Sequence, residues 1–151
     1  MKLTHKGEYS IKALLILARS FGEKPLSIRE ISADGNIPYK FLEQIMSELR
    51  QAQFVKSIQG RFGGYSLSRS PKEIMLGSVI RTIEGPLAPI GNAEEIKEKI
   101  KNGVAEPGFY FTLLEVRDAI SEILDHRSLT DVIEKSTDLS GSNEMFQMYH
   151  I

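Results

Sequence analysis

Polar side chains whose spacing suits hydrogen bonding to DNA lie in two segments of the chain. Lys40, Glu43 and Gln44 would share one face of a helix, because residues three and four apart lie on the same side. Arg61 stands among three glycines in the segment 59–64. A polar helix face can exchange hydrogen bonds with base edges in the major groove, and an arginine on a projecting turn can reach phosphates or the minor groove. The two segments together are typical of a DNA-binding surface.

The helices that would position the first segment follow from the spacing of apolar residues. Helices are predicted over residues 7–21 and from Pro38 onward, each with apolar residues at i, i+3, i+4 and i+7. These residues are Ile11, Leu14, Leu15 and Ala18 in the first helix and Leu42, Ile45, Met46 and Leu49 in the other. Between them, Ser27 and Glu30 form a capping box that opens a short helix, which ends in the turn residues 34–36. Two short helices joined by a turn predict a helix-turn-helix.

The second segment is predicted to be the tip of a β-hairpin. Residues 54–58 and 65–67 have strand character, and the glycine-rich segment 59–64 between them suits a tight turn. A helix-turn-helix followed by a hairpin with a cationic tip is a winged helix. The expected fold class is therefore mainly α with a small β-hairpin wing. A tight turn that carries one solvated arginine, without any DNA contact, is the alternative for Arg61.

Further helices are predicted after the hairpin. They cover residues 76–84, 92–102 and 109–127, and Asn92 caps the second of them. The longest has an apolar stripe formed by Leu113, Val116, Ile120, Ile123 and Leu124. After a complete winged helix this stripe needs a covering surface, and the same helix of a second copy is the economical solution. Packing within the same chain is the alternative. The apolar tail, residues 144–151, is expected to dock on the core.

Composition and charge limit the class of protein. The 151 residues are 41% hydrophobic and 26% charged, which is ordinary for a globular protein. The chain has no apolar run of membrane-helix length and no signal-peptide core, so we expect a soluble, cytoplasmic protein without a membrane partner. Residues 1–71 contain 11 Lys or Arg and 6 Asp or Glu, whereas residues 72–151 contain 8 and 14. A basic half that holds the predicted winged helix supports polyanion binding.

No arrangement of residues indicates an enzyme. The sequence has neither a Gly-x-Ser-x-Gly nucleophile motif nor a phosphate loop ending in Gly-Lys-Ser/Thr. His5, His126 and His150 are far apart in the chain, and the absence of cysteine removes thiol catalysis, disulfides and thiolate metal sites. We therefore expect a binding protein without catalytic residues and without a metal site.

The assembled motifs resemble the Rrf-type winged-helix transcriptional regulators along nearly the whole chain. The matching segments are Lys6-Gly7, Phe41-Leu42-Glu43-Gln44, Gly63-Gly64-Tyr65-Ser66-Leu67, Ile83-Glu84-Gly85-Pro86, Val116-Arg117-Asp118-Ala119-Ile120, Ser128-Leu129-Thr130-Asp131 and Met148-Tyr149-His150-Ile151. The resemblance implies a homodimeric, DNA-binding transcription factor whose long helices cross at the dimer interface. On this basis residues 1–84 are the winged helix-turn-helix domain and 85–108 a linker or effector loop with a short helix. Residues 109–127 are the dimerisation helix, and 128–151 are a C-terminal segment that docks back on the core.

The resemblance also implies particular contacts. The expected DNA-binding residues are Lys6, Ser27, Tyr39, Lys40, Glu43, Gln44, Lys56, Gln59, Arg61 and Gly63. The expected dimerisation residues are Leu113, Val116, Ile120, Ile123 and Leu124. Many family members have arginine at the position of Gln59. Because Arg61 would take over that role here, the operator preference of better-known members does not transfer to this chain.

Some members of this family hold iron–sulfur clusters with three cysteines that precede the long helix. Here the segment 91–108 has no cysteine, so the usual cluster site cannot form. Either the chain belongs to a cluster-free branch, or cysteines of a parent protein were replaced, with Ala93 and Ala105 at candidate positions. Glu8 matches the place of an acidic cluster ligand in some members, although the dipole of its helix is a sufficient reason for a glutamate there. We expect no cofactor in this chain, with an iron–sulfur cluster in an unaltered parent as the alternative.

The function expected from these observations is transcriptional regulation by a homodimer that binds double-stranded DNA at a pseudo-palindromic operator, with repression as the expected direction. One alternative is a cluster-sensing regulator whose ligand cysteines were replaced. Another is a regulator controlled mainly by a protein partner on the acidic half. A small-molecule effector is also left open.

Overall fold

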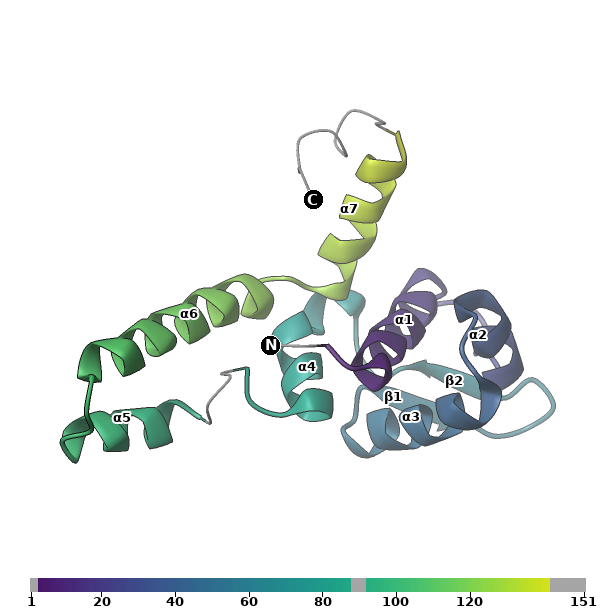
Figure 1. Cartoon of the computed structure of the whole chain (residues 1–151). Coiled ribbons are helices and arrows are strands. Elements are labelled where there is room, and N and C mark those ends of the chain that lie inside the picture. Colours follow the sequence, from purple (N-terminus) through teal and green to yellow (C-terminus); the bar gives the residue numbers. More distant parts are fainter. Residues whose placement is uncertain (1–2, 88–91, 142–151) are drawn as a thin grey trace.

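The structure is a computed structural model that describes residues 3–87 and 92–141, and it is mainly helical with one antiparallel hairpin (Figure 1). The expected fold class is confirmed. The elements in chain order are α1 (His5–Arg19), α2 (Ile28–Gly35), α3 (Tyr39–Gln51), β1 (Val55–Ile58), β2 (Gly64–Leu67), the 3-10 turn η1 (Pro71–Glu73), α4 (Leu76–Glu84), α5 (Ala93–Lys101), α6 (Pro107–Asp125) and α7 (Leu129–Gly141).

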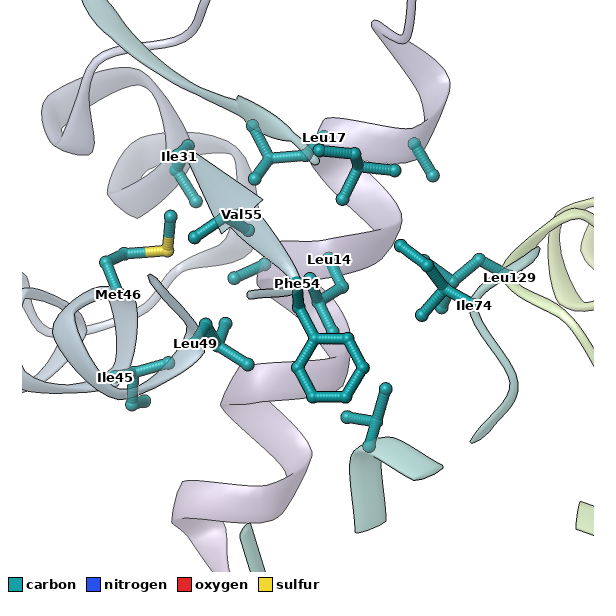
Figure 2. Close-up of a cluster of buried hydrophobic side chains, with 14 of the residues drawn as sticks. Leu14, Leu17, Ile31, Ile45, Met46, Leu49, Phe54, Val55, Ile74 and Leu129 are labelled. Atoms are coloured by element: carbon teal, nitrogen blue, oxygen red, sulfur yellow. The ribbon is translucent and has the colours of Figure 1, made fainter. Parts of the chain in front are cut away.

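One hydrophobic core joins the N-terminal helices to the hairpin (Figure 2). Helices α1, α2 and α3 contact one another, and α3 also contacts β1. The fully or almost fully buried side chains include Leu14, Leu17, Ile31, Ile45, Met46, Leu49, Phe54, Val55, Ile74 and Leu129. Each of these side chains contributes about 1.5–3 kcal/mol through removal of apolar surface from water. The core therefore fixes α3 against α1 and the hairpin, which leaves the opposite face of α3 to solvent.

The hairpin is anchored near its turn by a short pairing between β2 and Leu26, which lies two residues before α2. In the hairpin itself, Val55 pairs with Leu67 and Ile58 with Gly64. Leu26 and Tyr65 exchange two backbone hydrogen bonds, at 3.0 and 2.7 Å. Gly64 has φ +155°, and a side chain there would meet the backbone of Leu26. The entry to α2 and the wing are therefore held together by backbone contacts that only glycine at position 64 permits.

A clasp of polar side chains attaches α6 to α4. Arg81 on α4 donates two hydrogen bonds to Asp125 on α6, at 2.6 and 2.8 Å, and a third to Ser121 at 3.2 Å. Gly77 allows the approach, because a side chain there would meet the Asp125 carboxylate. Figure 1 shows α5 and α6 extending to one side of the molecule, away from α2 and from the loop that joins β1 and β2.

The bounds of several elements differ from those expected. Helix α1 begins two residues early, because the Thr4 hydroxyl accepts a hydrogen bond from the backbone of Gly7 and so caps the helix. The long helix spans Pro107–Asp125 rather than residues 109–127. Helix α7 follows Ser128, where no helix was predicted from the sequence, and its first residue, Leu129, is fully buried in the core. The tail expected to dock, residues 144–151, lies outside the described residues. No helix in the described ranges combines the length and apolar character needed to cross a membrane.

Candidate nucleic-acid interface

Helix α3 has one buried and one exposed face. Leu42, Ile45, Met46 and Leu49 are fully buried, which turns Lys40, Glu43 and Gln44 outward into solvent. Tyr39 at the start of the helix is 47% exposed. The side chains predicted to read DNA thus lie together on the free surface of the second helix of a helix-turn-helix. Their donors and acceptors match what base edges in a major groove present.

Ser27 is used within the protein. Its hydroxyl accepts a hydrogen bond from the backbone N–H of Glu30 at 3.2 Å and donates to the Glu30 carboxylate at 2.9 Å, while its own N–H donates to the same carboxylate at 2.8 Å. The hydrogen bonds from the backbone and hydroxyl of Ser27 hold the pKa of Glu30 below its ordinary value. The capping box expected from the sequence is confirmed. Because the only hydroxyl proton of Ser27 goes to Glu30, this residue has none left for a phosphate.

The tip of the wing presents a cation and an aromatic ring. Gln59, Arg61 and Phe62 are exposed, and the Arg61 guanidinium lies 5.7 Å from the centre of the Phe62 ring. Gly63 closes the turn with a 3.0 Å hydrogen bond from its N–H to the carbonyl of Gly60, and a side chain at position 63 would strike the carbonyl of Ile58. In residues 3–87 and 92–141 no carboxylate forms an ion pair with Arg61, so its charge is available to a ligand.

Lys56 lies at the base of the hairpin, separate from the tip. It pairs with Ser66 in the sheet and lines a shallow hollow together with Arg50 and Arg69. Arg69 is held by a 3.3 Å hydrogen bond to the carbonyl of Gln53, and its guanidinium lies 5.4 Å from the centre of the Phe54 ring. Arg50, an exposed residue in the last turn of α3, was not predicted from the sequence. The structure therefore groups Lys56 with the end of α3 and not with Arg61.

Lys6 and the segment around it are tied to the protein. The Lys6 ammonium lies 2.7 Å from the Glu48 carboxylate on α3. Glu84, at the end of α4, accepts hydrogen bonds from the backbone and hydroxyl of Thr4 at 3.0 and 2.5 Å. A side chain at Gly7 would meet this carboxylate. Two of the segments that carry the resemblance, Lys6-Gly7 and 83–86, therefore lie next to each other. Their contacts fix the start of α1 against α3 and α4.

The donor atoms present do not fit an iron–sulfur cluster. The sequence contains no cysteine, and thiolates are the usual ligands of such clusters. Much of the segment that would carry them is helix α5. Glu8 is exposed and forms an ion pair with Lys12 at 2.9 Å, and the hydrogen bond from Lys12 lowers the pKa of Glu8. Within the described part of the chain, no three His, Asp or Glu side chains come together as a metal site.

Helix α6 leaves its apolar stripe uncovered. None of its 19 residues is buried. Leu113, Ile120 and Leu124 are half-buried, whereas Val116 and Ile123 are 44% and 61% exposed. A cavity of about 320 Å³ lies between α4, the start of α5 and α6, with Arg81 and Arg117 in its lining. Both guanidinium groups are already paired, with Asp125 and Asp118.

A helix-turn-helix with an exposed polar second helix, followed by a hairpin with a free cation at its tip, defines a winged-helix DNA-binding protein. Comparison with known proteins adds the family. Residues 3–135 match the Rrf2 family, described as "Iron-dependent Transcriptional regulator". The chain belongs to the Rrf2 family of DNA-binding transcriptional regulators.

Similar proteins extend over the whole chain. It is 36% identical to the HTH-type transcriptional regulator CymR of Bacillus subtilis over 149 residues, which are 99% of each protein. The solved structure of that CymR, described as the global cysteine regulator of B. subtilis, has a TM-score of 0.76 over 89% of this chain and 98% of its own, at 36% identity. IscR of T. potens has a TM-score of 0.67 and 31% identity, with 99% and 97% covered. These relatives are transcriptional regulators, so the expectation that the chain is not an enzyme is confirmed.

Proposed function

We propose that the protein is a repressor that binds a pseudo-palindromic operator as a homodimer. The observation that carries the proposal is the uncovered apolar stripe of α6. An amphipathic helix normally buries such a stripe against a partner. A two-fold axis through α6 would bury it against the same helix of a second copy and bring in a second winged helix. Two winged helices related by such an axis match an operator with two half-sites an integral number of helical turns apart.

The proposed DNA contacts fall into three groups by their chemistry. The first group enters the major groove and comprises Tyr39, Lys40, Glu43 and Gln44. Of these, Glu43 and Gln44 exchange hydrogen bonds with base edges. Arg61, with Gln59 and Gly63 beside it, reaches the adjacent minor groove. Lys56 and Lys6 face phosphates, and Lys6 would exchange its ion pair with Glu48 for one with DNA. Ser27 supports the surface by capping α2.

We also propose the division of the chain that the sequence suggested. Residues 1–84 form the DNA-binding unit, 85–108 connect it to α6, 109–127 dimerise and 128–151 return to the core. The burial of Leu129 in the core and the pairing of Met75 with Ser128 support the return to the core at the start of the last segment.

Regulation without a resident iron–sulfur cluster is part of the proposal. It is supported by the cysteine-free sequence and by the pairing of Glu8 with Lys12. The test is the iron content and optical spectrum of protein purified without oxygen from the unaltered source gene. A colourless, iron-free protein that binds DNA supports a cluster-free regulator controlled by a protein partner or a small molecule. A cluster spectrum would show that cysteines had been removed from this chain.

The experiment that tests the operator proposal begins with selection of bound duplexes from a random pool. We expect the selected duplexes to contain two inverted half-sites, and we expect footprinting to protect both. Transcription from a promoter that overlaps the selected site should fall when the protein is added. A single, asymmetric half-site bound by one copy would contradict the homodimer, and increased transcription would contradict repression.

A further inference from the structure

We propose that Phe62 is an apolar wedge that enters the minor groove of the operator beside Arg61 and partly unstacks one base step. The inference rests on the proposed DNA contacts and deepens them, because it adds a contact that is neither electrostatic nor a hydrogen bond. It assigns a role to a side chain to which the sequence motifs gave none.

The exposure of Phe62 is the first observation. Its ring is 81% exposed, more than any other large hydrophobic side chain in the described residues. The next most exposed, Ile123 at 61%, and Phe109 and Phe111 all lie on α6, where a second copy would cover the apolar stripe. The loop that carries Phe62 lies at the opposite end of the molecule from α6 (Figure 1), so the proposed dimer contact does not account for it.

The construction of the tip is the second observation. The backbone of Gly63 lies so close to the carbonyls of Ile58 and Gly60 that a side chain at this position would strike them. Gly64 lies similarly close to the backbone of Leu26. These contacts hold the turn to the body of the protein on one side. The ring of Phe62 therefore projects from a braced turn, and a wedge needs this bracing because it must push two base pairs apart.

The neighbours of the ring are the third observation. The Arg61 guanidinium lies 5.7 Å from the ring centre, so the tip presents the charge and the ring side by side. The hollow next to the ring is lined by Lys24, Pro25, Ser27 and Glu30 at the start of α2, which belongs to the helix-turn-helix itself. The negative potential of a narrow minor groove attracts Arg61, and the same approach brings the ring to the floor of the groove.

The expected target of the Phe62 ring is a base step that opens at low energetic cost. Apolar side chains inserted from the minor groove unstack base steps and bend the duplex toward the major groove. Pyrimidine–purine steps open at the lowest cost. We therefore expect such a step in each half-site where the wing lies, and a bend that depends on the ring.

The experiment compares Phe62→Ala, Phe62→Leu and Arg61→Ala with the unmodified chain. Each is titrated with the duplex selected by the unmodified protein and with an unselected duplex of the same length, at several salt concentrations, and DNA bending is measured by energy transfer between the duplex ends. Phe21→Ala is the matched control, because Phe21 is also exposed (46%) but follows α1, outside the proposed contacts. Circular dichroism and sedimentation test whether folding and assembly are unchanged in each variant.

The expected results separate the ring from the charge. Phe62→Ala should bind the selected duplex about tenfold more weakly, because burial of the ring no longer contributes. It should bend the duplex less and keep the salt dependence of the unmodified protein. Phe62→Leu should retain most of the bend. In Arg61→Ala the association constant should fall less steeply with salt. The magnitude of the slope of log K against log salt concentration should decrease by about 1 for each phosphate charge that the variant no longer neutralises.

Other outcomes overturn the inference. Unchanged affinity and bending in Phe62→Ala would exclude the wedge, and weaker self-association in that variant would assign the ring to a protein contact. If the unmodified protein selects no duplex at all, the proposed operator binding fails, and this result is distinct from failure of the wedge alone.

Discussion

Glu43 and Arg61 illustrate two ways in which single residues contribute to DNA binding. Arg61 offers a positive charge that the negative potential of a minor groove attracts, so it contributes mainly to affinity. Glu43 carries a negative charge that phosphates repel. It strengthens binding only where a base offers a hydrogen-bond donor, such as the amino group of cytosine. An exposed carboxylate on the reading face of α3 is therefore a source of specificity rather than of affinity.

The first prediction concerns this carboxylate. Glu43→Ala should relax base preference at one position of each half-site, since a good base contact discriminates by about 1–3 kcal/mol. Binding to an unselected duplex should be unchanged or tighter, because repulsion from phosphates is removed. Competition with every single-base variant of the selected site measures the effect. Glu23→Ala, an exposed carboxylate beyond α1, is the control. An unchanged preference at all positions would exclude Glu43 from base reading.

The second prediction concerns the turn of the wing. Gly63→Ala should destabilise the protein by about 1–3 kcal/mol, because the added carbon meets a backbone carbonyl that cannot move without breaking the hairpin. Urea unfolding measures this. Gly108→Ala is the matched control, since nothing lies near its added carbon. Equal stabilities of the two variants would mean that the turn adapts freely, which would also weaken the case for a braced wedge.

At the scale of elements, the clasp between α4 and α6 attaches the long helix to the winged helix. Arg81 and Asp125 form a bidentate pair, and each is a little over one-third exposed. The hydrogen bond from Arg81 lowers the pKa of Asp125, with a smaller contribution from the charge of Arg81. The pair orients two elements that meet at Gly77, where the backbone of α4 comes close to the carboxylate.

The third prediction follows from this clasp. Asp125→Asn should lower stability at pH 7 by about 1 kcal/mol or less, since both groups are partly solvated. A carboxylate whose pKa is lowered in the folded state stabilises the protein above its unfolded pKa, and this stabilisation is lost as the pH falls through the folded pKa. The difference between variant and parent should therefore shrink between about pH 5 and pH 3. Thermal unfolding at each pH measures it.

The control for the clasp is Asp118→Asn. Asp118 pairs with its chain neighbour Arg117 and joins no two elements, so its replacement should leave stability nearly unchanged. A difference between Asp125→Asn and the parent that stays constant down to pH 3 would contradict the role assigned to the Asp125 charge.

The elements predictable from the sequence are those with a local signal. The capping box at Ser27, the apolar period of α3 and the bounds of α4 were all predicted, because each depends on residues within one or two helical turns. The pairing of Leu26 with Tyr65 and the clasp of Arg81 with Asp125 were not predicted. The partners in each pair lie far apart in the chain, and no repeating pattern of residues connects them. The same reason applies at the site: the face of α3 was predicted, whereas the pairing of Lys6 with Glu48 was not.

Helix α7 was missed for a different reason. Its 13 residues are largely polar, and its N-terminal half reaches the core, through the fully buried Leu129 and the partly buried Ile133. Hydrophobic periodicity detects helices that bury a stripe along their length. A polar helix anchored at one end gives only a cap signal, which is what Ser128 and Asp131 provide through their mutual hydrogen bonds.

At the scale of the whole molecule, the distribution of charged residues agrees with the proposed division into a DNA-binding part and a dimerisation part. Residues 1–71 carry the excess of basic residues and the wing, while residues 72–151 are acidic and include α6. In Figure 1 the wing and α6 lie at opposite ends. Attraction to DNA is thus concentrated on one part of a chain whose net charge is only −1. We expect this separation to orient the protein on the duplex and to limit binding through the rest of its surface.

The last prediction tests the assembly. Ile123→Glu places a charge at the most exposed position of the α6 stripe. The separated chain keeps this charge in water, whereas the proposed dimer would have to desolvate it, so the variant should be monomeric at concentrations at which the parent is dimeric. Sedimentation equilibrium measures the mass. The control is Glu115→Lys, which changes charge on the outward face of the same helix and should remain dimeric.

The effect on DNA binding is the decisive part of this prediction. A dimer gains affinity because binding of one winged helix holds the second at high effective concentration over the other half-site. Ile123→Glu should therefore lose most of its affinity for the full operator, while both proteins bind an isolated half-site equally weakly. If the variant is monomeric yet binds the full operator as tightly as the parent does, each winged helix acts alone. In that case α6 must be covered by something other than a second copy of this chain.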